Sequence, residues 1–230
     1  MHETAMEYGA AFFNTYLKNA KELTIVDIGS QDVNGSLRTV APPNNKYIGV
    51  DFVEAKGVDV VITDLYSLPF EDESVDAVVS NSCFEHSEFF WLLFNEILRM
   101  LKPSGLLYLS APSNGGIFHR YPVDCWRFFP DSGVALQNWG KRSGYNCALL
   151  ESFIGVRKNG IWNDFVAVFI KYESNHGKHT SRIQNVSLPF TNGRLYNSEN
   201  ISNYVEPSQD LVRLKALIKV ENDLKQILRK

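Results

Sequence analysis

Short apolar runs alternate with segments of helical periodicity along most of the chain. Apolar runs rich in Val, Ile, Leu and Phe predict buried strands, whereas apolar positions that recur every three to four residues predict amphipathic helices. The expected helices span residues 4–19, 88–101 and 131–143. The expected strands span residues 23–28, 46–52, 58–64, 75–81, 106–112, 147–155 and 163–172.

This alternation predicts an α/β fold built on a Rossmann-like, doubly wound, seven-stranded sheet with helices on both faces. The sheet should be mostly parallel. The strands at 147–155 and 163–172 lie close enough along the chain to pair as an antiparallel hairpin at the C-terminal edge. In such sheets ligands bind beyond the carboxyl ends of the strands, where the strand order reverses.

The composition changes after residues 1–172, which form the expected main domain. Residues 173–206 are polar and predict a linker, in which the Asn-Gly pair of LPFTNGRLYN (188–197) predicts a small hairpin. Residues 207–230 predict a C-terminal amphipathic helix with Ser208 as its N-cap. Its uneven apolar stripe should dock on the main domain or pair with a second copy as a homodimer.

The composition excludes several classes of protein. The 230 residues are 44% hydrophobic and 21% charged, as in ordinary globular proteins, and the net charge of −3 offers no basic field to nucleic acid. The three cysteines, Cys83, Cys125 and Cys147, predict neither a disulfide framework nor a zinc site. The sequence has no recognisable signal peptide and no apolar run long enough to span a membrane, so a cytoplasmic location is expected.

Three aspartates mark the ends of the first three expected strands: Asp27, Asp51 and Asp64. A carboxylate after the second strand is the usual acceptor for both ribose hydroxyls of an adenosine. The turn after the first strand, within IVDIGSQDVNGS (25–36), lacks the G-x-G-x-x-G pattern that a pyrophosphate needs, and its Asp32 would repel phosphate. A ligand with a cationic end and no phosphate, such as S-adenosylmethionine (SAM), therefore suits the turn better than NAD.

The motifs IVDIGSQDVNG, YIGVDF, DLYSLPFEDESVDAVVSNSCFEH and ILRMLKPSGLLYLSAP resemble those of class I SAM-dependent methyltransferases of the type 11 branch. The resemblance covers residues 1–172 and implies that this segment is a methyltransferase domain with SAM as cofactor. The sequence departs from the common G-x-G-x-G pattern at Gln31, which stands in place of the second glycine.

The resemblance also implies roles for individual residues near the reactive end of SAM. Asp27, Gly29 and Ser30 would line its methionine end. Asn81 and Ser82 would form the floor beneath the sulfonium. Each acidic or polar residue could instead be a helix cap or a solvated strand end.

At the adenosine end, the resemblance implies that Asp51 holds the ribose and that Phe52 packs beside the adenine. Asp64 and the backbone of Leu65 would meet the adenine amino group. His86 belongs to a Glu-His pair that the whole family shares. It would border the cofactor pocket or order the loop after the fourth strand.

The loop GGIFHRYPVDCWRFFPD (115–131) lies where a methyl acceptor should bind. Its aromatic rings could stack on a sugar or a base, with Tyr121 and Trp126 in contact with the acceptor, and Arg120 and Arg127 could clamp an anionic group. Trp126 could instead serve packing, and Arg127 could pair with Asp124. A similar block occurs in type 11 methyltransferases associated with surface-polysaccharide gene clusters, which implies a sugar or nucleotide-sugar acceptor.

His119 is the expected general base for a hydroxyl acceptor, because it stands in this loop and an imidazole can take a proton near neutral pH. Asp124 is the rival candidate for the base. The sequence shows no cluster of carboxylates and histidines that indicates a bound metal, so no metal is expected.

Two other functions stay open at this point. An NAD-dependent oxidoreductase or epimerase is disfavoured, since both G-x-G-x-x-G and a Y-x-x-x-K pair are missing from the sequence. A SAM-binding or scaffold protein without catalysis, in which the C-terminal helix is the functional part, is compatible with every motif.

Overall fold

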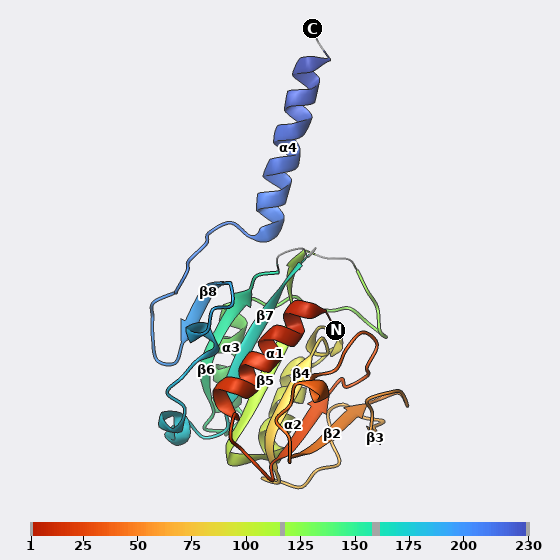
Figure 1. Ribbon diagram of the computed structural model, residues 1–230, viewed down its shortest axis with the longest axis vertical. Coiled ribbons are helices and arrows are strands. Elements are labelled where there is room, and N and C mark those ends of the chain that lie inside the picture. Colours follow the sequence, from red (N-terminus) through yellow and green to blue (C-terminus); the bar gives the residue numbers. More distant parts are fainter. Residues whose placement is uncertain (1, 116–117, 158–161, 229–230) are drawn as a thin grey trace.

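The computed structural model describes residues 2–115, 118–157 and 162–228. Its centre is one eight-stranded sheet flanked by helices (Figure 1). The strands are β1 (Thr24–Ile28), β2 (Lys46–Asp51), β3 (Val60–Val61), β4 (Val75–Asn81), β5 (Leu101–Gly115), β6 (Ala148–Gly155), β7 (Trp162–Ile170) and β8 (Phe190–Leu195).

The strand order is β3-β2-β1-β4-β5-β7-β6-β8. The pairs among β1 to β5 are parallel, while β7, β6 and β8 pair antiparallel. The predicted Rossmann-like α/β fold with an antiparallel C-terminal edge is therefore confirmed. The chain leaves β1 toward β2 on one side and returns to β4 on the other. The strand order thus reverses between β1 and β4, where such sheets bind ligands.

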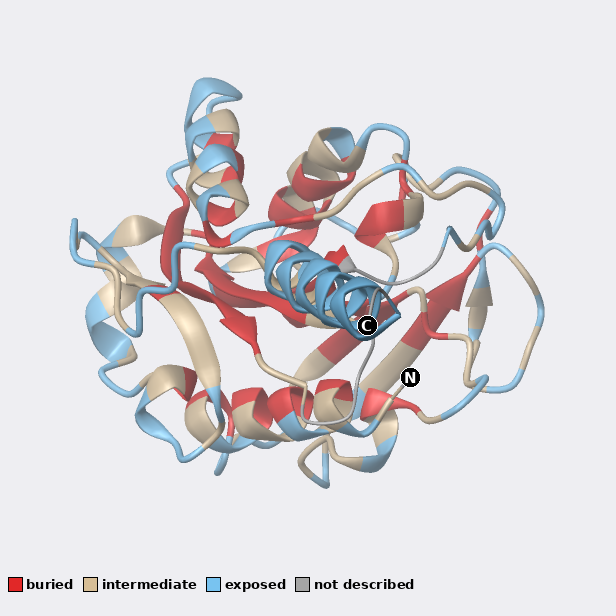
Figure 2. Ribbon diagram, turned by 90° about the horizontal axis from the view of Figure 1, so that it is seen from above, coloured by how far each residue is buried: buried red, intermediate tan, exposed pale blue. Residues whose placement is uncertain are grey.

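Helices cover both faces of the sheet, as predicted (Figure 2). On one face α1 (Glu3–Tyr16) packs Tyr8, Phe12 and Phe13 against side chains of β1, β4 and β5. On the other face lie α2 (Phe90–Met100) and α3 (Pro130–Arg142), and α2 inserts Phe94 and Ile97 into a second core. β1 lies between the two cores. Its side chains are buried on both faces, which explains its continuous apolar run.

The eighth strand is a departure from the predicted seven-stranded sheet. The Asn192-Gly193 pair does not form the turn of a separate hairpin; it lies within β8, which pairs with β6. Asn192 adopts a positive φ of 53°, and the pairing register between β6 and β8 shifts beside it. The turn-like conformation of Asn192 therefore forms an irregularity within an edge strand and not a hairpin turn. Gly193 also bridges to Ser202 on the returning chain.

The segment expected to be a polar linker is fastened to the sheet. Its 3-10 helix η4 (Ile183–Asn185) buries Ile183 against the α1 side of the sheet. The buried carboxylate of Glu151 in β6 accepts hydrogen bonds from the amides of Ile183 (2.7 Å) and Gln184 (3.1 Å) and from the hydroxyl of Tyr16 (2.7 Å). One carboxylate thus joins α1, β6 and the chain beyond residue 172.

The C-terminal helix α4 (Gln209–Ile227) projects away from the sheet (Figure 1). Ser208 caps it as predicted, since its hydroxyl accepts from the amide of Leu211 (3.2 Å). No residue of α4 is buried, although the helix carries many large apolar side chains. Within the described ranges, every helix is too short or too polar to cross a membrane.

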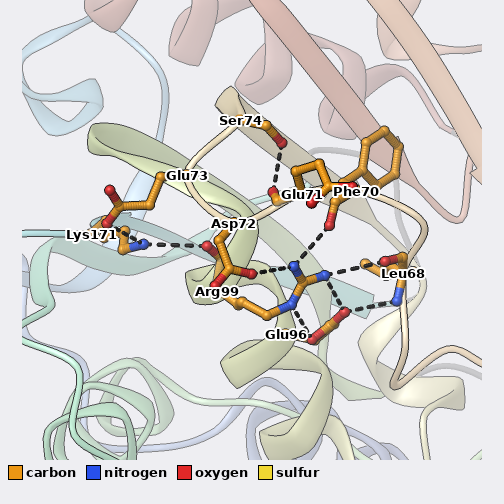
Figure 3. Close-up of polar contacts among 9 residues, drawn as sticks. All are labelled: Leu68, Phe70, Glu71, Asp72, Glu73, Ser74, Glu96, Arg99 and Lys171. Carbon is orange, nitrogen blue, oxygen red and sulfur yellow. Dashed lines mark hydrogen bonds and ion pairs between the residues drawn. The ribbon is translucent and has the colours of Figure 1, made fainter.

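A polar network closes the amino ends of β4 and β5 (Figure 3). Arg99, in the last turn of α2, donates to the carbonyls of Leu68 (3.2 Å) and Phe70 (2.8 Å) and pairs with Glu96 and Asp72. It thereby holds the loop that leads into β4. A depression of about 700 Å³ lies here, and its two cations, Arg99 and Lys171, are both paired with carboxylates.

We expect Arg99→Met to lower the free energy of unfolding by about 1–3 kcal/mol, because two partly buried carbonyls and the Glu96 carboxylate lose their charged donor. Urea denaturation followed by circular dichroism measures this. The control is Arg142→Met at an exposed site near the end of α3. Equal stability of the two variants would show that the network does not hold the loop.

Candidate functional site

A cavity of about 190 Å³ lies beyond the carboxyl ends of β1, β2 and β4, at the reversal of strand order. Seven of its lining residues were predicted from the sequence as cofactor- or acceptor-binding residues, whereas Val33, Gly35 and Cys83 were assigned to no site. Gln31 had been noted only as a departure from the glycine pattern. The lining residues are Gly29, Gln31, Val33, Gly35, Asp51, Phe52, Asn81, Ser82, Cys83, His86 and Tyr121.

The turn after β1 is shaped by Gly29. This residue has a φ of +81°, and a Cβ at its position would lie 2.7 Å from the Cβ of Cys83. Both the conformation and the close approach therefore require glycine. The amide of Gly29 donates to the carbonyl of Val50 (3.0 Å), which ties the turn to the end of β2. Gly29 thus stands on the cavity wall, as expected for a cofactor turn.

Asp51 ends β2 beside this turn and is only 6% exposed. Its Oδ1 accepts from the amide of Phe52 (2.7 Å) and its Oδ2 from the amide of Gln31 (3.3 Å). Two backbone bonds therefore orient the carboxylate, while each oxygen keeps capacity for a further donor. Such a carboxylate can accept from paired hydroxyls of a ligand in the cavity.

Asn81 ends β4 and Ser82 follows it, and both line the cavity. The side-chain nitrogen Nδ2 of Asn81 donates to the hydroxyl of Ser82 (3.0 Å), and Ser82 has a positive φ of 53°. Oδ1 of Asn81 is buried and has no hydrogen-bond partner among the residues that the structure describes. A buried acceptor of this kind requires a donor. A ligand in the cavity could supply one.

Two aromatic rings stand at the mouth of the cavity. Phe52 and Tyr121 are about half exposed, and their ring centroids are 5.6 Å apart. They come from the end of β2 and from the loop after β5, so the mouth is made by parts of the chain that are distant in sequence. The cavity is smaller than the roughly 300–1,000 Å³ of common ligand sites.

Two predicted cofactor residues lie beneath the cavity lining. Asp27 is buried and accepts a hydrogen bond from the hydroxyl of Tyr47 (2.7 Å). Burial raises the pKa of the Asp27 carboxyl to about 7, although the bond from Tyr47 lowers it. Ser30 is also buried, and a Cβ at Gly49 would lie 2.7 Å from its hydroxyl oxygen, so Ser30 packs against β2. Both residues support the turn from below.

Asp64 and Leu65 also lie outside the lining. Expected strand 58–64 is reduced to β3, and Asp64 is exposed beyond it, where its carboxylate accepts from the amide of Tyr66 (2.8 Å). Leu65 packs against the core on the α2 side. Both residues therefore shape the turn after β3, and their predicted contacts with a ligand stay predictions.

A buried carboxylate stands behind His86. The 3-10 helix η2 (Phe84–His86) places Glu85 in the interior with 0% exposure. Neither carboxylate oxygen has a hydrogen-bond partner among the described residues. Burial raises the pKa of Glu85 to about 8. Oε1 of Glu85 lies 3.7 Å from Nε2 of His86 and 4.0 Å from Nε2 of His119.

This grouping differs from the sequence-based expectation of no carboxylate–histidine cluster. Ligand atoms of Glu85, His86 and His119 all lie within 4.8 Å of one another. The loop after β5 reaches η2 because the amides of Cys125 (2.8 Å) and Trp126 (3.3 Å) donate to the carbonyl of Glu85. The Glu-His pair was visible in the sequence, but its approach to His119 depends on this long-range backbone pairing.

Asp124 joins two other residues of the loop after β5, which we call the acceptor loop because the sequence predicts acceptor binding there. Its carboxylate accepts from the amide of His119 (2.9 Å), and Oδ2 lies 3.5 Å from Nδ1 of the same residue. Arg127 donates to both oxygens, at 2.5 and 2.9 Å. The hydrogen bond and charge of Arg127 lower the pKa of Asp124 to about 2. Arg127 therefore forms the pair with Asp124 that the sequence left open as an alternative to acceptor binding.

The remaining predicted acceptor residues divide into packed and exposed side chains. The indole nitrogen of Trp126 donates to the carbonyl of Ser87 (2.9 Å), and its ring packs edge-on against Phe90, as the packing alternative expected. Arg120 and Tyr121 are exposed. Tyr121 also lines the cavity, and the predicted acceptor contacts of both residues stay predictions.

Comparisons with known proteins agree with this architecture. Residues 8–109 match the family model described as a methyltransferase domain. An uncharacterized methyltransferase of Mycobacterium leprae is 42% identical over 59 residues, which is 26% of this chain and 19% of the relative. One of Mycolicibacterium gilvum is 35% identical over 83 residues, 36% of this chain and 29% of the relative. The chain thus spans less than a third of these curated relatives.

Solved structures share the fold at low sequence identity. The 1,6-didemethyltoxoflavin-N1-methyltransferase of Burkholderia thailandensis, with bound S-adenosylhomocysteine, aligns with a TM-score of 0.59 at 16% identity, over 74% of this chain and 79% of that one. The cyclase SpnF aligns with a TM-score of 0.54 at 14% identity, over 73% of this chain and 82% of that one. These likenesses show the fold, and the chemistry must be argued from the site.

Proposed function

We propose that this protein is a SAM-dependent methyltransferase that acts on a hydroxyl oxygen of a small polar acceptor, sugar-like or nucleotide-sugar-like in character. The observation that carries the proposal is the cavity at the reversal of strand order. There a glycine turn at Gly29 faces the oriented carboxylate of Asp51. The match of residues 8–109 to a methyltransferase domain supports the same reading.

The charge of the cavity favours SAM over NAD. None of the residues found to line it is a lysine or an arginine, and Asp51 contributes a carboxylate. Asp32, in the same turn, pairs with Lys56 (2.6 Å) and accepts from the amide of Gly35 (2.9 Å). A pyrophosphate needs donors and positive charge at this turn. SAM presents a sulfonium and an ammonium, both of which an acidic environment favours.

SAM would lie across the carboxyl ends of β1, β2 and β4. Asp51 would accept from the ribose hydroxyls, and Phe52 would pack on the adenine. Gly29 and Ser82 would flank the methionine end, while the free Oδ1 of Asn81 would accept from the ammonium group. Asp27 and Ser30 would act from below the turn, and Asp64 with Leu65 would border the adenine amino group.

The acceptor would enter from the loop after β5, where Arg120, Tyr121 and His119 lie. Its hydroxyl oxygen attacks the methyl carbon of SAM, and the carbon–sulfur bond breaks with its electron pair passing to sulfur. The hydroxyl proton passes to water as the oxygen attacks, and alignment of oxygen, carbon and sulfur provides much of the rate. We infer that His119, oriented by Asp124, activates this hydroxyl.

The alternative function is that of a protein with this fold that transfers no methyl group, since a cyclase shares the architecture. The chain could then be a SAM-binding scaffold whose functional part is α4. Turnover separates these readings. Transfer of a radioactive methyl group from SAM to a panel of sugars and nucleotide sugars is the direct assay.

The three cysteines are free thiols, which supports a cytoplasmic location. A second copy of the chain is the proposed macromolecular partner. Leu217, Val220, Leu224 and Ile227 are more than half exposed and recur at spacings of three and four, which is the pattern of a two-helix seam. Pairing of two α4 helices would bury this seam.

Asp51→Ala should weaken SAM binding about ten- to a hundredfold, because two ribose hydroxyls lose an oriented acceptor, worth about 1–3 kcal/mol. Isothermal titration calorimetry of the full chain with SAM measures the change. Asp223→Ala, the same substitution at an exposed site on α4, is the control. Unchanged affinity in Asp51→Ala would remove this carboxylate from the cofactor site.

His119→Ala should lower turnover by about two to four orders of magnitude with nearly unchanged SAM affinity, because the group that activates the hydroxyl is lost. Methyl transfer at saturating SAM is the measurement. His176→Ala, in the 3-10 helix η3 (Glu173–Lys178), is the matched control. A loss under tenfold would assign activation of the acceptor elsewhere.

Removal of residues 206–230 should convert a dimer into a monomer in light scattering while SAM binding persists. The substitution Leu224→Glu places a charge in the seam and should act in the same way. Asn222→Glu, on the opposite face of α4, should leave the dimer intact. A full-length chain that is already monomeric at high concentration would refute pairing through α4.

A further inference from the structure

We propose that Glu85, His86 and His119 bind a divalent transition-metal ion of the zinc class beside the cofactor cavity. One carboxylate and two imidazoles present their ligand atoms within 4.8 Å of one another. Two of the three residues come from η2 and the third from the loop after β5. The proposal that an ion binds here depends only on this geometry. The role of the ion in catalysis rests in addition on the proposed function.

Glu85 is the first reason for a cation at this position. Its side chain is fully buried, yet neither carboxylate oxygen has a hydrogen-bond partner among the described residues. Leaving a buried polar group unsatisfied is costly, and a carboxylate is a particularly expensive case. A cation coordinated by these oxygens would satisfy both the charge and the lone pairs. The Nε2 atoms of His86 and His119 lie within 4.0 Å of the same carboxylate oxygen.

The orientation of the two imidazoles is the second reason. Nδ1 of His86 lies 2.5 Å from the carbonyl oxygen of Val123, and Nδ1 of His119 lies 3.5 Å from Oδ2 of Asp124. The carbonyl of Val123 can accept the proton of Nδ1 of His86, and the carboxylate of Asp124 faces Nδ1 of His119. The Nε2 atoms of the two rings face Glu85 and lie 3.7 and 4.0 Å from its Oε1. Metal-binding histidines typically have such an outer acceptor on the nitrogen that does not bind the metal.

Arg127 extends this arrangement outward. It holds Asp124 through two hydrogen bonds, and Asp124 in turn holds the backbone and ring of His119. Asp124 is thus a positioning residue for His119. Arg127 and Asp124 therefore act together to orient the imidazole of His119.

The donor set decides which ions fit. Two histidines and one glutamate bind zinc in catalytic sites that keep a position open, and two histidines with one carboxylate also bind iron(II). Magnesium and calcium prefer oxygen ligands, so they fit this set poorly. We therefore assign the site to zinc or a neighbouring first-row ion. Small rotations of the side chains would bring the atoms to the bond lengths of about 2.0–2.2 Å that zinc requires.

The position of the site gives the ion a role in the proposed reaction. His86 also lines the cavity proposed for SAM, so the ion would lie at the edge of that cavity, next to the loop after β5. An acceptor hydroxyl at the open position would have its pKa lowered and would release its proton to water. The resulting oxygen attacks the methyl carbon, and sulfur retains the electron pair of the broken bond. His119 would activate the hydroxyl by holding the ion.

The test uses the full chain, stripped with a chelator and then titrated with Co²⁺ and Zn²⁺. Visible absorption of Co²⁺ and calorimetry with Zn²⁺ should both report one ion per chain. Glu85→Gln, nearly identical in shape, should weaken binding at least a hundredfold, and Asp124→Asn should weaken it about ten- to a hundredfold. Glu88→Gln, an exposed site in the same loop, should bind as the unmodified chain does.

Circular dichroism checks that each variant is folded, and metal binding is compared only among variants whose spectrum matches that of the unmodified chain. The proposal is overturned if the unmodified chain binds neither ion, or if Glu85→Gln binds Co²⁺ as tightly and with the same spectrum. SAM binding by the metal-free chain is measured separately. Loss of SAM binding with intact Co²⁺ binding would refute the methyltransferase and leave the metal site, whereas the reverse result would refute only the metal site.

Discussion

The reversal of strand order between β1 and β4 is the constraint on which the rest of the structure depends. The chain leaves β1 on one side and β4 on the other, so the space beyond their carboxyl ends cannot be filled by either crossover. Gly29 lets the first turn pass close to Cys83, and the amides of that turn are tied to the end of β2. The cavity follows from this topology, and glycines, short polar side chains and the rings of Phe52 and Tyr121 line it.

A place at the carboxyl edge of the sheet does not by itself bring a side chain into the cavity, as the three aspartates Asp27, Asp51 and Asp64 illustrate. All three follow or end strands of the parallel part of the sheet, yet only Asp51 lines the cavity. Asp27 points to the α1 side, where burial and Tyr47 set its environment, while Asp64 lies exposed beyond a strand of only two residues. The period of two along a strand decides which face a carboxylate meets, and the end of the strand decides its exposure.

The loop after β5 links the cavity at the reversal of strand order to the buried Glu85. Backbone donors from Cys125 and Trp126 meet the carbonyl of Glu85, and Trp126 anchors its ring on the start of α2. These bonds hold His119 against η2, and Asp124 orients it. A loop with many aromatic rings thus serves two purposes. Its inner rings attach it to the domain, and its exposed Tyr121 lines the cavity.

The sequence by itself determined the order of strands and helices, the carboxyl edge that carries the site, and the glycine and aspartate that face the cavity. Those features depend on local periodicity and on turn chemistry, which neighbouring residues encode. Only the tertiary structure decided that 190–195 joins the sheet as β8, that Arg127 belongs to Asp124, and that Glu85 meets His119. These outcomes depend on where distant segments return. Long-range hydrogen bonds and burial set that path, and the spacing of residues along the chain does not record it.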